Sequence, residues 1–386
     1  MKRKAEPAHR HRVIVYSHDV ELLGAERALL LVVQHLVARG YVVLVVVPRH
    51  GPLISRLEEK GARVVRCRMP MWLARTKAWP VFLARVLGAI ATFPFLLWIS
   101  ARFRPCIAYT NSWVIPEGAV AARLLRVPHI WHIREYELGN ETLQSQLPMS
   151  VIRRLTLRWS TELLAISSGV ADQFDRDDVR VVHAGVEIER TDGASEPDDA
   201  IWLRAGSPSL LLLGTISAAK GTAVAIEAMA VVRDQLPGAR LLIAGHGKPA
   251  LLDTLRATIA SHGLQDGVHI VPFSDEPISL MRASDIVLMP SRHEAYGLVT
   301  VQALTLGIPV VGSASGGTRD LLTLGGGLLA EVGEPRHFAG HIEAIATDGA
   351  LRDWLSAQGR AAAATLSPDA EGRAVEDEVK RHCLSD

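Results

Sequence analysis

The chain has 386 residues, and its 42 Lys and Arg nearly balance its 41 Asp and Glu, which gives a formal net charge of +1 at pH 7. This length exceeds one ordinary hydrophobic core, so two domains are expected. The balanced charge gives no general affinity for nucleic acid, and the apolar composition excludes a disordered chain.

The chain opens with short apolar runs that alternate with helical patterns, as in a doubly wound α/β domain. Residues 13–16 predict a strand, residues 25–39 an apolar helix, and residues 41–47 a second strand. The loop before the helix ends at Gly24, where a glycine lets the backbone approach a ligand closely. A tight turn from strand to helix explains the same glycine equally well.

Residues 69–105 combine aromatic and basic side chains, including Trp72, Trp79, Phe82, Phe93, Phe95 and Trp98 with Arg75, Lys77, Arg85, Arg102 and Arg104. A membrane span needs about 20 apolar residues, and Arg85 and Pro94 interrupt this segment. We therefore expect a helix that lies in the membrane interface, with its basic side chains toward anionic headgroups. A packed helix pair beneath the N-terminal sheet is the alternative.

A later strand, residues 128–135, runs to the edge of the N-terminal sheet. His132 and Arg134 are two residues apart and so lie on one face of this strand. A cationic Arg can stabilise the charge of a leaving phosphate, although it cannot act as a base. A salt bridge between Arg134 and Glu135 or another neighbour is the structural alternative.

The second half of the chain begins after a polar stretch, residues 187–208, which predicts an interdomain linker. Residues 210–213 predict a strand, and the loop that follows contains Thr215 and Lys220. Lysine is a compact point charge that suits a phosphate group. Two more strands, residues 241–244 and 268–272, lead to the turn at Gly245 and to Phe273.

The stretch 284–320 is the one around which the second half is organised. Residues 285–289 predict a strand buried on both faces of a parallel sheet, and a polar turn with Glu294 follows it. Residues 297–306 are helical in period, and residues 308–311 predict another buried strand before a glycine loop. Two strand ends, a helix N-terminus and a glycine loop thus open on the sheet edge where α/β proteins bind ligands.

These residues resemble the donor-site signature of the family 4 retaining glycosyltransferases, also called glycosyltransferases group 1. The matching residues are Glu294, Ala295, Tyr296, Gly297 and Leu298, then Gln302, then Gly307-Ile-Pro-Val-Val, then Gly316-Gly317. The family signature has two acidic residues eight positions apart, whereas the second position here is Gln302.

The resemblance covers nearly the whole chain and implies the GT-B fold, in which two Rossmann-like α/β domains face each other across a cleft. It places an acceptor-binding domain at residues 12–190 and a nucleotide-sugar donor-binding domain at residues 205–366. A C-terminal helix, residues 367–386, is expected to cross back and pack on the N-terminal domain.

The same resemblance implies the roles of individual residues. The expected catalytic residues are Glu294, Lys220, Arg134 and His132. The expected donor-binding residues are Gly24, Thr215, Lys220, Gly245, Phe273, Glu294, Ala295, Tyr296, Gly297, Leu298 and Gln302.

The sequence departs from the family pattern at Gln302, at Thr215 and at the pair Arg134-Glu135. Gln302 replaces the carboxylate that accepts the ribose hydroxyls, but its amide still offers one carbonyl acceptor. Thr215 stands where relatives often have Arg. Arg134 and Glu135 stand where much of the family has His-Asp, which leaves open the roles of these residues and of His132.

The resemblance predicts a retaining glycosyltransferase that moves a hexose-type sugar from a nucleotide-diphosphate sugar to an acceptor hydroxyl. We expect neither a metal nor another cofactor, because no His and carboxylate cluster has the spacing of a metal site. Residues 69–105 favour a lipid-linked acceptor, polysaccharide or glycoconjugate biosynthesis, and peripheral membrane contact. A soluble natural-product acceptor and a nucleotide-sugar-binding protein with little activity are the alternatives. An NAD-dependent enzyme is disfavoured, since no Gly-x-Gly-x-x-Gly follows the first strand.

Cysteine usage bears on the compartment. Cys67, Cys106 and Cys383 are scattered without the spacing of a metal site or a disulfide framework. They predict free thiols in a reducing compartment. We therefore expect a cytoplasmic protein, at the inner face of the cytoplasmic membrane if residues 69–105 contact lipid.

Overall fold

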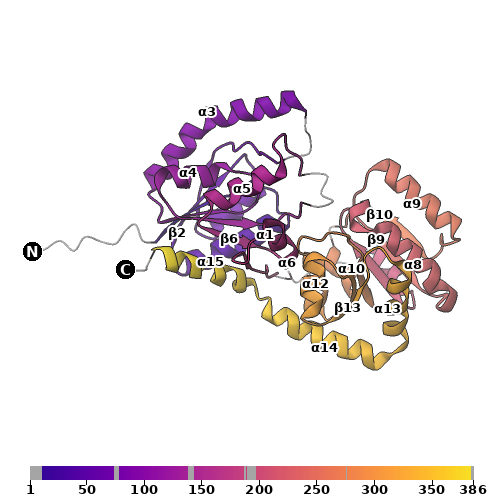
Figure 1. The fold of residues 1–386 in the computed structure, drawn as a ribbon. Coiled ribbons are helices and arrows are strands. Elements are labelled where there is room, and N and C mark those ends of the chain that lie inside the picture. The colour runs from indigo at the N-terminus through magenta and orange to yellow at the C-terminus, as the bar shows by residue number, and fades with distance from the viewer. Residues whose placement is uncertain are drawn as a thin grey trace, which may run out of the picture. The chain divides into compact units, whose positions relative to one another are not determined.

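The computed structural model describes residues 11–73, 78–137, 143–186, 188, 197–274 and 276–383. The chain divides into two compact units, Met1–Gly185 with Pro368–Asp386, and Val186–Ser367. Each unit is built on one parallel sheet with helices on its faces (Figure 1). The fold class predicted from the sequence, two Rossmann-like α/β domains, is confirmed.

The N-terminal unit has a seven-stranded sheet in the order β3-β2-β1-β4-β5-β6-β7, with every recorded pair parallel. Its strands are β1 (Arg12–Tyr16), β2 (Val42–Val47), β3 (Arg63–Arg66), β4 (Ile107–Thr110), β5 (His129–Ile133), β6 (Glu162–Ala165) and β7 (Arg180–Val181). The central strands β1, β4 and β5 are buried almost throughout, because helices cover both faces of the sheet. This explains why their sequences are continuous apolar runs.

Two groups of helices cover the faces of this sheet. They are α1 (Gly24–Ala38), α2 (Pro52–Glu59), α3 (Trp79–Phe103), α4 (Glu117–Leu125), α5 (Met149–Trp159), the short α6 (Ser168–Ala171) and the C-terminal α15 (Pro368–Cys383). Helices α3, α4 and α5 lie on one side of the sheet, and α1 and α15 lie on the other (Figure 1). The C-terminal helix thus packs on the N-terminal sheet, as the sequence predicts.

The C-terminal unit has a six-stranded parallel sheet in the order β10-β9-β8-β11-β12-β13. Its strands are β8 (Ser209–Leu213), β9 (Arg240–Ala244), β10 (Val268–Val271), β11 (Ile286–Met289), β12 (Val310–Ser313) and β13 (Gly327–Ala330). Its helices are α7 (Asp198–Arg204), α8 (Thr222–Gln235), α9 (Pro249–Ser261), α10 (Pro277–Arg282), α11 (Leu298–Leu306), α12 (Gly316–Thr323), α13 (Pro335–Thr347) and α14 (Gly349–Thr365). The chain order changes direction between β8 and β11, so ligands are expected at the carboxyl ends of these strands.

Helix α7 corrects the prediction that residues 187–208 form a linker. Ala200 and Leu203 of this helix are fully buried in the core of the C-terminal unit. The helix could not be predicted from the polar composition of this stretch, because only two of its seven residues are buried in the core. Residues 187 and 189–196 lie outside the described part of the chain.

Helix α3 corrects the alternative of a helix pair in residues 69–105. It is one helix of 25 residues that continues through Pro94, and only Leu96, Ile99 and Ser100 are buried. Arg75 and Lys77, which belong to the predicted aromatic and basic pattern, lie outside the described residues.

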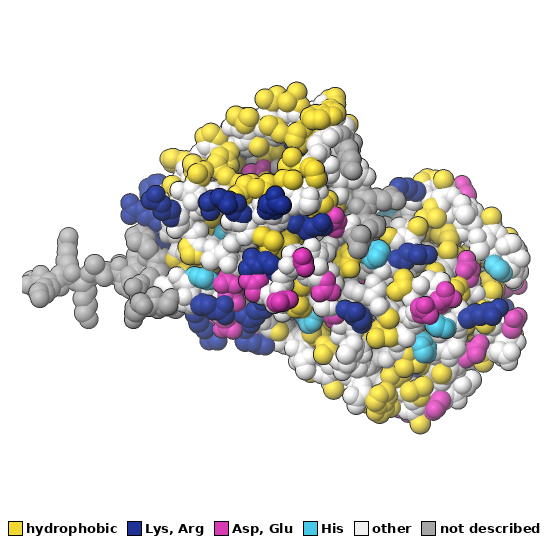
Figure 2. Space-filling view, in the orientation of Figure 1, with side chains coloured by type: hydrophobic (Ala, Val, Ile, Leu, Met, Phe, Trp, Pro, Cys, Tyr) yellow, Lys and Arg dark blue, Asp and Glu magenta, His cyan; other side chains and the backbone are white. Residues whose placement is uncertain are grey.

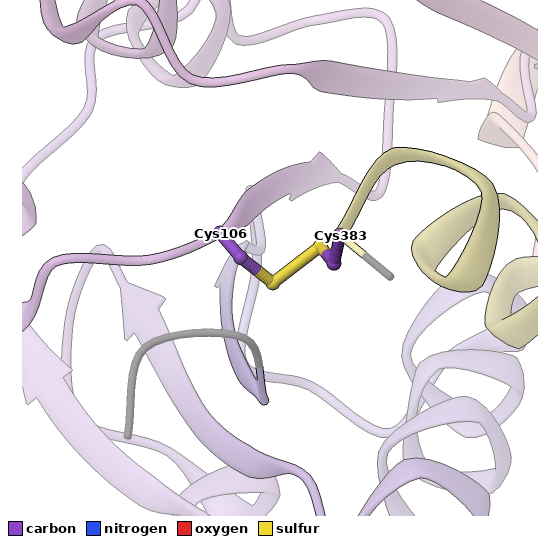
Figure 3. The surroundings of a disulfide bond; sticks show 2 residues. All are labelled: Cys106 and Cys383. Atoms are coloured by element: carbon purple, nitrogen blue, oxygen red, sulfur yellow. A yellow bond between two sulfur atoms is a disulfide. The ribbon is translucent and has the colours of Figure 1, made fainter. Parts of the chain in front are cut away.

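A disulfide joins Cys106, next to β4, to Cys383 at the end of α15 (Figure 3). Their Cα atoms are 5.7 Å apart although 277 residues separate them in the sequence. The prediction of free thiols is therefore wrong for these two residues and holds only for the buried Cys67. Since disulfides are rare in reducing compartments, the cysteines no longer support a cytoplasmic location.

Glu117, in the first turn of α4, is an uncommon buried acid. The residue is 4% exposed, and neither of its carboxylate oxygens has a hydrogen-bond partner among the described residues. Burial raises the pKa of this carboxyl from 4.5 to about 8. At neutral pH the native state therefore binds a proton that the unfolded state has released.

We predict that this group makes the protein less stable as the pH rises from about 5 to about 8, because the unfolded state releases a proton that the buried carboxyl of the native state keeps. The loss approaches about 1.4 kcal/mol per pH unit within this window. Glu117→Gln, which cannot titrate, removes this contribution. Thermal unfolding of both proteins at several pH values measures it, and a constant difference in Tm across the window contradicts the prediction.

Candidate functional site

The predicted donor-site residues of the C-terminal unit follow the carboxyl ends of its strands. Thr215 and Lys220 come after β8, Gly245 after β9, Phe273 after β10, and Glu294 after β11. Because all six strands are parallel, these ends meet at one edge of the sheet. The structure thus brings the predicted donor-site residues of this unit to a common edge.

An ion pair between Lys220 and Glu294 lies at the centre of this edge. The Lys220 Nζ atom is 2.7 Å from Glu294 Oε2, and the Ser291 hydroxyl donates to the same oxygen at 3.0 Å. The Glu294 side chain is 9% exposed, whereas that of Lys220 is 37% exposed. The carboxylate is therefore fixed in the protein, while the ammonium group remains accessible to an anion.

The short 3₁₀ turn before Lys220 fixes the start of this loop. The Ser217 hydroxyl accepts a hydrogen bond from the Lys220 backbone N–H at 3.2 Å. Gly221 follows with a φ of +69°, and a Cβ there would overlap the carbonyl group of Pro290. The Arg292 N–H donates to the Ala219 carbonyl at 2.8 Å. The loop after β8 therefore packs directly on the turn that carries Glu294.

Two further glycines support the same turn from the other side. A Cβ on Gly316 would overlap the Glu294 carbonyl, and one on Gly317 would overlap the backbone of Tyr296. The Gly317 N–H donates to the Glu294 carbonyl at 2.9 Å. The glycine pair of the sequence motif thus allows α12 to contact the backbone of the turn.

Helix α11 begins directly after this turn. Gly297 is its N-cap residue with a φ of +96°, a conformation that favours glycine. The first N–H groups of a helix have no intrahelical partner, and the helix dipole favours negative charge at this end. Tyr296 is buried, Ala295 and Leu298 are half-buried, and Gln302 is half-buried one turn further along. The start of α11 can therefore bind an anionic group next to Lys220.

A flat aromatic surface lies at the ends of β9 and β10. Phe273 is 55% exposed, and its ring stacks on that of His246 with centroids 5.9 Å apart. Gly245 packs against Gly214, since a Cβ on Gly245 would overlap the Gly214 carbonyl. Thr215 is exposed beside them. An exposed aromatic pair of this kind can stack against a planar base.

The candidate residues of the N-terminal unit belong to a different arrangement. Arg134 forms a buried ion pair with Glu371 of α15, and its Nε atom donates to Asn111 Oδ1 at 2.7 Å. The Tyr109 hydroxyl is 2.9 Å from His132 Nδ1, and the Glu371 carboxylate is 3.4 Å from the same nitrogen. Arg134 therefore ties the end of β5 to the C-terminal helix, as in the structural alternative, although the partner is not Glu135.

The ionisation of this cluster follows from its burial. Burial and the Arg134 charge lower the pKa of His132 well below its ordinary value, so the imidazole is neutral. Burial alone would lower the pKa of Arg134, but the Glu371 carboxylate raises it. The guanidinium is therefore charged, and the Glu371 carboxylate compensates its charge. The Glu135 carboxylate instead accepts hydrogen bonds from the backbone N–H groups of Trp113 and Arg134, at 2.9 and 3.0 Å.

Gly24 begins α1 at the same edge of the N-terminal sheet, where the Asn111 amide donates to the Ala25 carbonyl at 3.0 Å. Glu26, in the first turn of α1, is 1% exposed, and burial raises the pKa of its carboxyl. The His18 Nδ1 atom lies 3.4 Å from Glu26 Oε1. This edge therefore offers a half-exposed imidazole in contact with a buried acid.

Several of these contacts were not predicted from the sequence. Ser291 comes directly after strand β11 and Pro290. This position at a strand end was the only sequence feature that could have identified it as a site residue. His246 lies in the glycine turn predicted at Gly245, but its ring was not predicted to be part of the site. Glu371 carries no local signal, because its partner Arg134 is 237 residues away in the sequence.

One group of possible metal ligands is present among the described residues. Ligand atoms of Glu162, Glu378 and His382 lie within 4.8 Å of one another in the N-terminal unit. Arg180 and Arg381 both pair with Glu378, at 2.7 and 2.8 Å. These two guanidinium groups already neutralise the cluster, so its chemistry does not suit a cation.

Comparisons with known proteins agree with these observations. The family model of the glycosyl transferases group 1 matches residues 197–362, and that of the glycosyl transferase 4-like domain matches residues 24–185. A D-inositol 3-phosphate glycosyltransferase of Jonesia denitrificans is 35% identical over 42% of this chain and 40% of its own length. A glycogen synthase of Mycobacterium tuberculosis is 28% identical over 68% of this chain and 64% of its own length. The chain thus spans less than two thirds of these two relatives.

A longer match and two solved structures complete the comparison. A 2-deoxystreptamine N-acetyl-D-glucosaminyltransferase of Streptomyces fradiae is 27% identical over 85% of this chain and 81% of its own length. HepE of Anabaena, solved with UDP and glucose, has a TM-score of 0.76 at 20% identity over 96% of this chain and all of its own. Sucrose-phosphate synthase of Thermosynechococcus elongatus has a TM-score of 0.70 at 18% identity over 97% and 99% of the two chains. At these identities the structural likeness shows the fold alone.

We predict that Gly317→Ala destabilises the C-terminal unit by about 1–3 kcal/mol, because the new methyl group displaces the turn that carries Glu294. Gly340→Ala in α13 is the matched control, since no atom lies within 4 Å of its Cβ position. That substitution should be neutral or stabilising by up to about 1 kcal/mol. Denaturant unfolding of both variants measures the effect, and equal stabilities contradict the assigned role of Gly317.

We also predict that Glu371→Gln destabilises the N-terminal unit by about 3–5 kcal/mol, because it leaves the buried Arg134 charge without a counter-charge. Asp377→Asn on the exposed face of α15 is the control and should change stability by less than about 0.5 kcal/mol. Thermal unfolding compares the two variants. A loss no larger than that of the control shows that Arg134 is not held by this pair.

Proposed function

Because the chain belongs to the glycosyltransferases group 1 (family 4) and has their GT-B fold, we propose that it transfers a hexose-type sugar with retention from a nucleotide-diphosphate sugar to an acceptor hydroxyl. The observation that carries the proposal is the cluster of Lys220, Glu294 and Ser291 beside the start of α11. Fixed acceptors for sugar hydroxyls and accessible donors for phosphate lie together there. Such a site suits both ends of a sugar diphosphate.

The proposed reaction breaks the bond between the anomeric carbon and the diphosphate oxygen, which leaves with negative charge. The Lys220 ammonium group and the N–H groups at the start of α11 can stabilise that charge without a metal. The Glu294 carboxylate would accept hydrogen bonds from the sugar hydroxyls and hold the ring. We favour attack of the acceptor on the same face that the diphosphate leaves, without a covalent intermediate and with the acceptor proton passing to the departing phosphate oxygen.

We propose that the base of the donor stacks on Phe273 and His246 and that Gln302 accepts one ribose hydroxyl. The exposed aromatic pair at the ends of β9 and β10 supports this placement. Solved relatives of the same fold bind UDP and UDP-glucose, so a uridine nucleotide is the first donor to test. Gln302 has fewer acceptor atoms than a carboxylate, which would weaken ribose binding without abolishing it.

The roles first expected of His132 and Arg134 become less direct in this proposal. Arg134 is neutralised by Glu371, and His132 is buried and neutral. We propose that they position the ends of β4 and β5 for acceptor binding. The pair of His18 and Glu26 lies at the same edge and would contact the acceptor, while Gly24 keeps the donor-binding role expected from the sequence.

We propose a lipid-linked acceptor in polysaccharide or glycoconjugate assembly, met at the inner face of the cytoplasmic membrane by residues 69–105. The exposed apolar helix α3 supports this. A soluble aminocyclitol acceptor is the second candidate, favoured by the similarity to 2-deoxystreptamine glycosyltransferases. A nucleotide-sugar-binding protein without transfer is a third, motivated by Thr215 and Gln302, and it would bind donor but form no product with any acceptor.

We predict that Glu294→Gln lowers the transfer rate by about a hundredfold or more, because the fixed carboxylate no longer holds the sugar. Glu331→Gln, at a side chain that is 69% exposed in the same unit, should leave the rate unchanged. Calorimetric titration with nucleotide diphosphates and their sugars, with and without a chelator, first identifies the donor for the assay. An undiminished rate in Glu294→Gln contradicts the assigned site, and a loss of donor binding in chelator contradicts a metal-independent reaction.

A further inference from the structure

We propose that the layer of α3, α4 and α5 is a peripheral docking surface for a lipid bilayer that carries anionic headgroups. The proposal rests on the membrane-linked acceptor of the proposed function and extends it in two ways. It adds α4 and α5, which lie outside residues 69–105, and it assigns contact with the headgroups to the exposed arginines in and next to these two helices as well.

The outward face of α3 is apolar along its length. Leu83, Leu87, Ile90 and Trp98 are 56%, 58%, 65% and 60% exposed, and their spacing places them on one helical face together with the exposed Pro94. A surface helix of a soluble protein normally has charged and polar side chains on its solvent-facing side and apolar side chains toward the core. Figure 2 shows this face as a ridge of hydrophobic side chains along the top of the N-terminal unit. A contiguous apolar patch of this kind is typical of an interaction site.

The inner face of α3 is attached to the sheet. Leu96 and Ile99 are buried, and the Ser100 hydroxyl is 2.8 Å from the Tyr16 hydroxyl of β1. Arg12 donates to the Phe103 carbonyl at 3.0 Å. The helix is long and apolar enough to cross a bilayer, with a mean hydropathy of 1.9 in a window that is 11% buried. A spanning helix would have to leave these contacts, whereas a helix lying in the interface keeps them.

The charge of this layer is of one sign. Glu117 is the only acid in α3, α4 and α5, and it is buried. Between Glu59 and Glu117 the sequence has nine Lys and Arg and no acid. Helix α3 packs on α4, and α4 packs on α5. The exposed arginines in and next to these three helices are Arg102, Arg104, Arg123, Arg126, Arg154 and Arg158.

This charge selects among possible occupants of the apolar face. Figure 2 shows Lys and Arg side chains in a row beneath the hydrophobic ridge. Since the whole chain has a net charge of only +1, the positive charge is concentrated on this side. An anionic lipid surface matches both the apolar ridge and the basic row. A second copy of the chain would place two rows of arginines against each other.

The aromatic residues of α3 suit the same environment. Trp79 is 69% exposed near the start of the helix, and Trp98 stacks on the exposed Phe95 with centroids 6.0 Å apart. Tryptophan favours the boundary between headgroups and acyl chains. Anchors at both ends would keep the helix parallel to the membrane.

The test is co-sedimentation of the full chain with vesicles of phosphatidylcholine, with and without phosphatidylglycerol, at low and high salt. We expect the wild type to bind the anionic vesicles more tightly and to lose that preference at high salt. Leu87→Gln/Ile90→Gln should abolish binding to both vesicles. Arg154→Glu/Arg158→Glu should weaken binding to the anionic vesicles about thirty-fold or more, at about fivefold per basic residue.

Two control variants carry the same kinds of change in the C-terminal unit. Leu324→Gln/Trp354→Gln removes exposed apolar side chains, and Arg336→Glu/Arg352→Glu reverses two exposed charges. Both should bind vesicles as the wild type does. Equal effects of the test and control variants overturn the proposal.

Three further outcomes also overturn it. The first is a wild type that binds no vesicle. The second is resistance of the bound protein to salt and alkaline extraction, which indicates a spanning helix. The third is a dimer in light scattering that Leu87→Gln/Ile90→Gln dissociates, which assigns the face to a second copy.

The same proteins separate this proposal from the proposed function. Donor binding, measured by calorimetry without vesicles, should be unchanged in all four variants. A wild type that binds donor but no vesicle leaves the transferase proposal standing and removes the docking surface. A wild type that binds anionic vesicles but no nucleotide sugar leaves the docking surface standing and removes the transferase proposal.

Discussion

The candidate site depends on one constraint, the close backbone packing around the turn that carries Glu294. Gly221 allows the loop after β8 to contact Pro290, and Gly316 with Gly317 allows α12 to contact residues 294–296. Any larger residue at these positions would separate the elements, because the atoms that it would meet are backbone atoms with no rotamer to change. The Lys220–Glu294 ion pair follows from this packing, since it forms only if the two loops are held together. The glycines of the motif are thus required for geometry before they serve a ligand.

The N-terminal unit is held together by contacts of a different kind. The last helix, α15, is joined to the sheet by the buried pair of Arg134 and Glu371 and by the disulfide between Cys106 and Cys383. A buried ion pair contributes little net stability compared with apolar packing, but it penalises every arrangement in which one charge lacks its partner. We infer that the pair fixes the register of α15 on the sheet, while Val375 and Val379 supply the apolar contact.

The features that were predicted correctly are those that local sequence encodes. The strands at residues 13–16 and 210–213 were predicted to within one residue of their observed bounds, because a strand buried on both faces is apolar at nearly every position. The strand, turn and helix around Glu294 were also predicted, because their residues are contiguous and have a specific spacing. The features that were missed depend on residues far apart. Cys106 and Cys383 are 277 positions apart, and no local pattern relates Arg134 to Glu371. Helix α7 was missed for a third reason, since a short helix with two core residues has almost no periodicity.

The two faces of the N-terminal sheet differ in a way that links fold to function. On one face, α1 and α15 carry acids and bases that pair with one another, such as His35 with Glu376 at 2.7 Å and Arg381 with Glu378 at 2.8 Å. On the other face, α3, α4 and α5 carry arginines, and the single acid Glu117 is withdrawn into the interior, where burial keeps it protonated near neutral pH. A carboxylate at the surface of this layer would repel anionic headgroups, whereas a buried and neutral one does not. For a protein surrounded only by water, burying the Glu117 carboxyl costs free energy. Exposing the apolar outward face of α3 costs free energy as well. Both become understandable if this layer faces a membrane, because exposed apolar area then becomes binding energy.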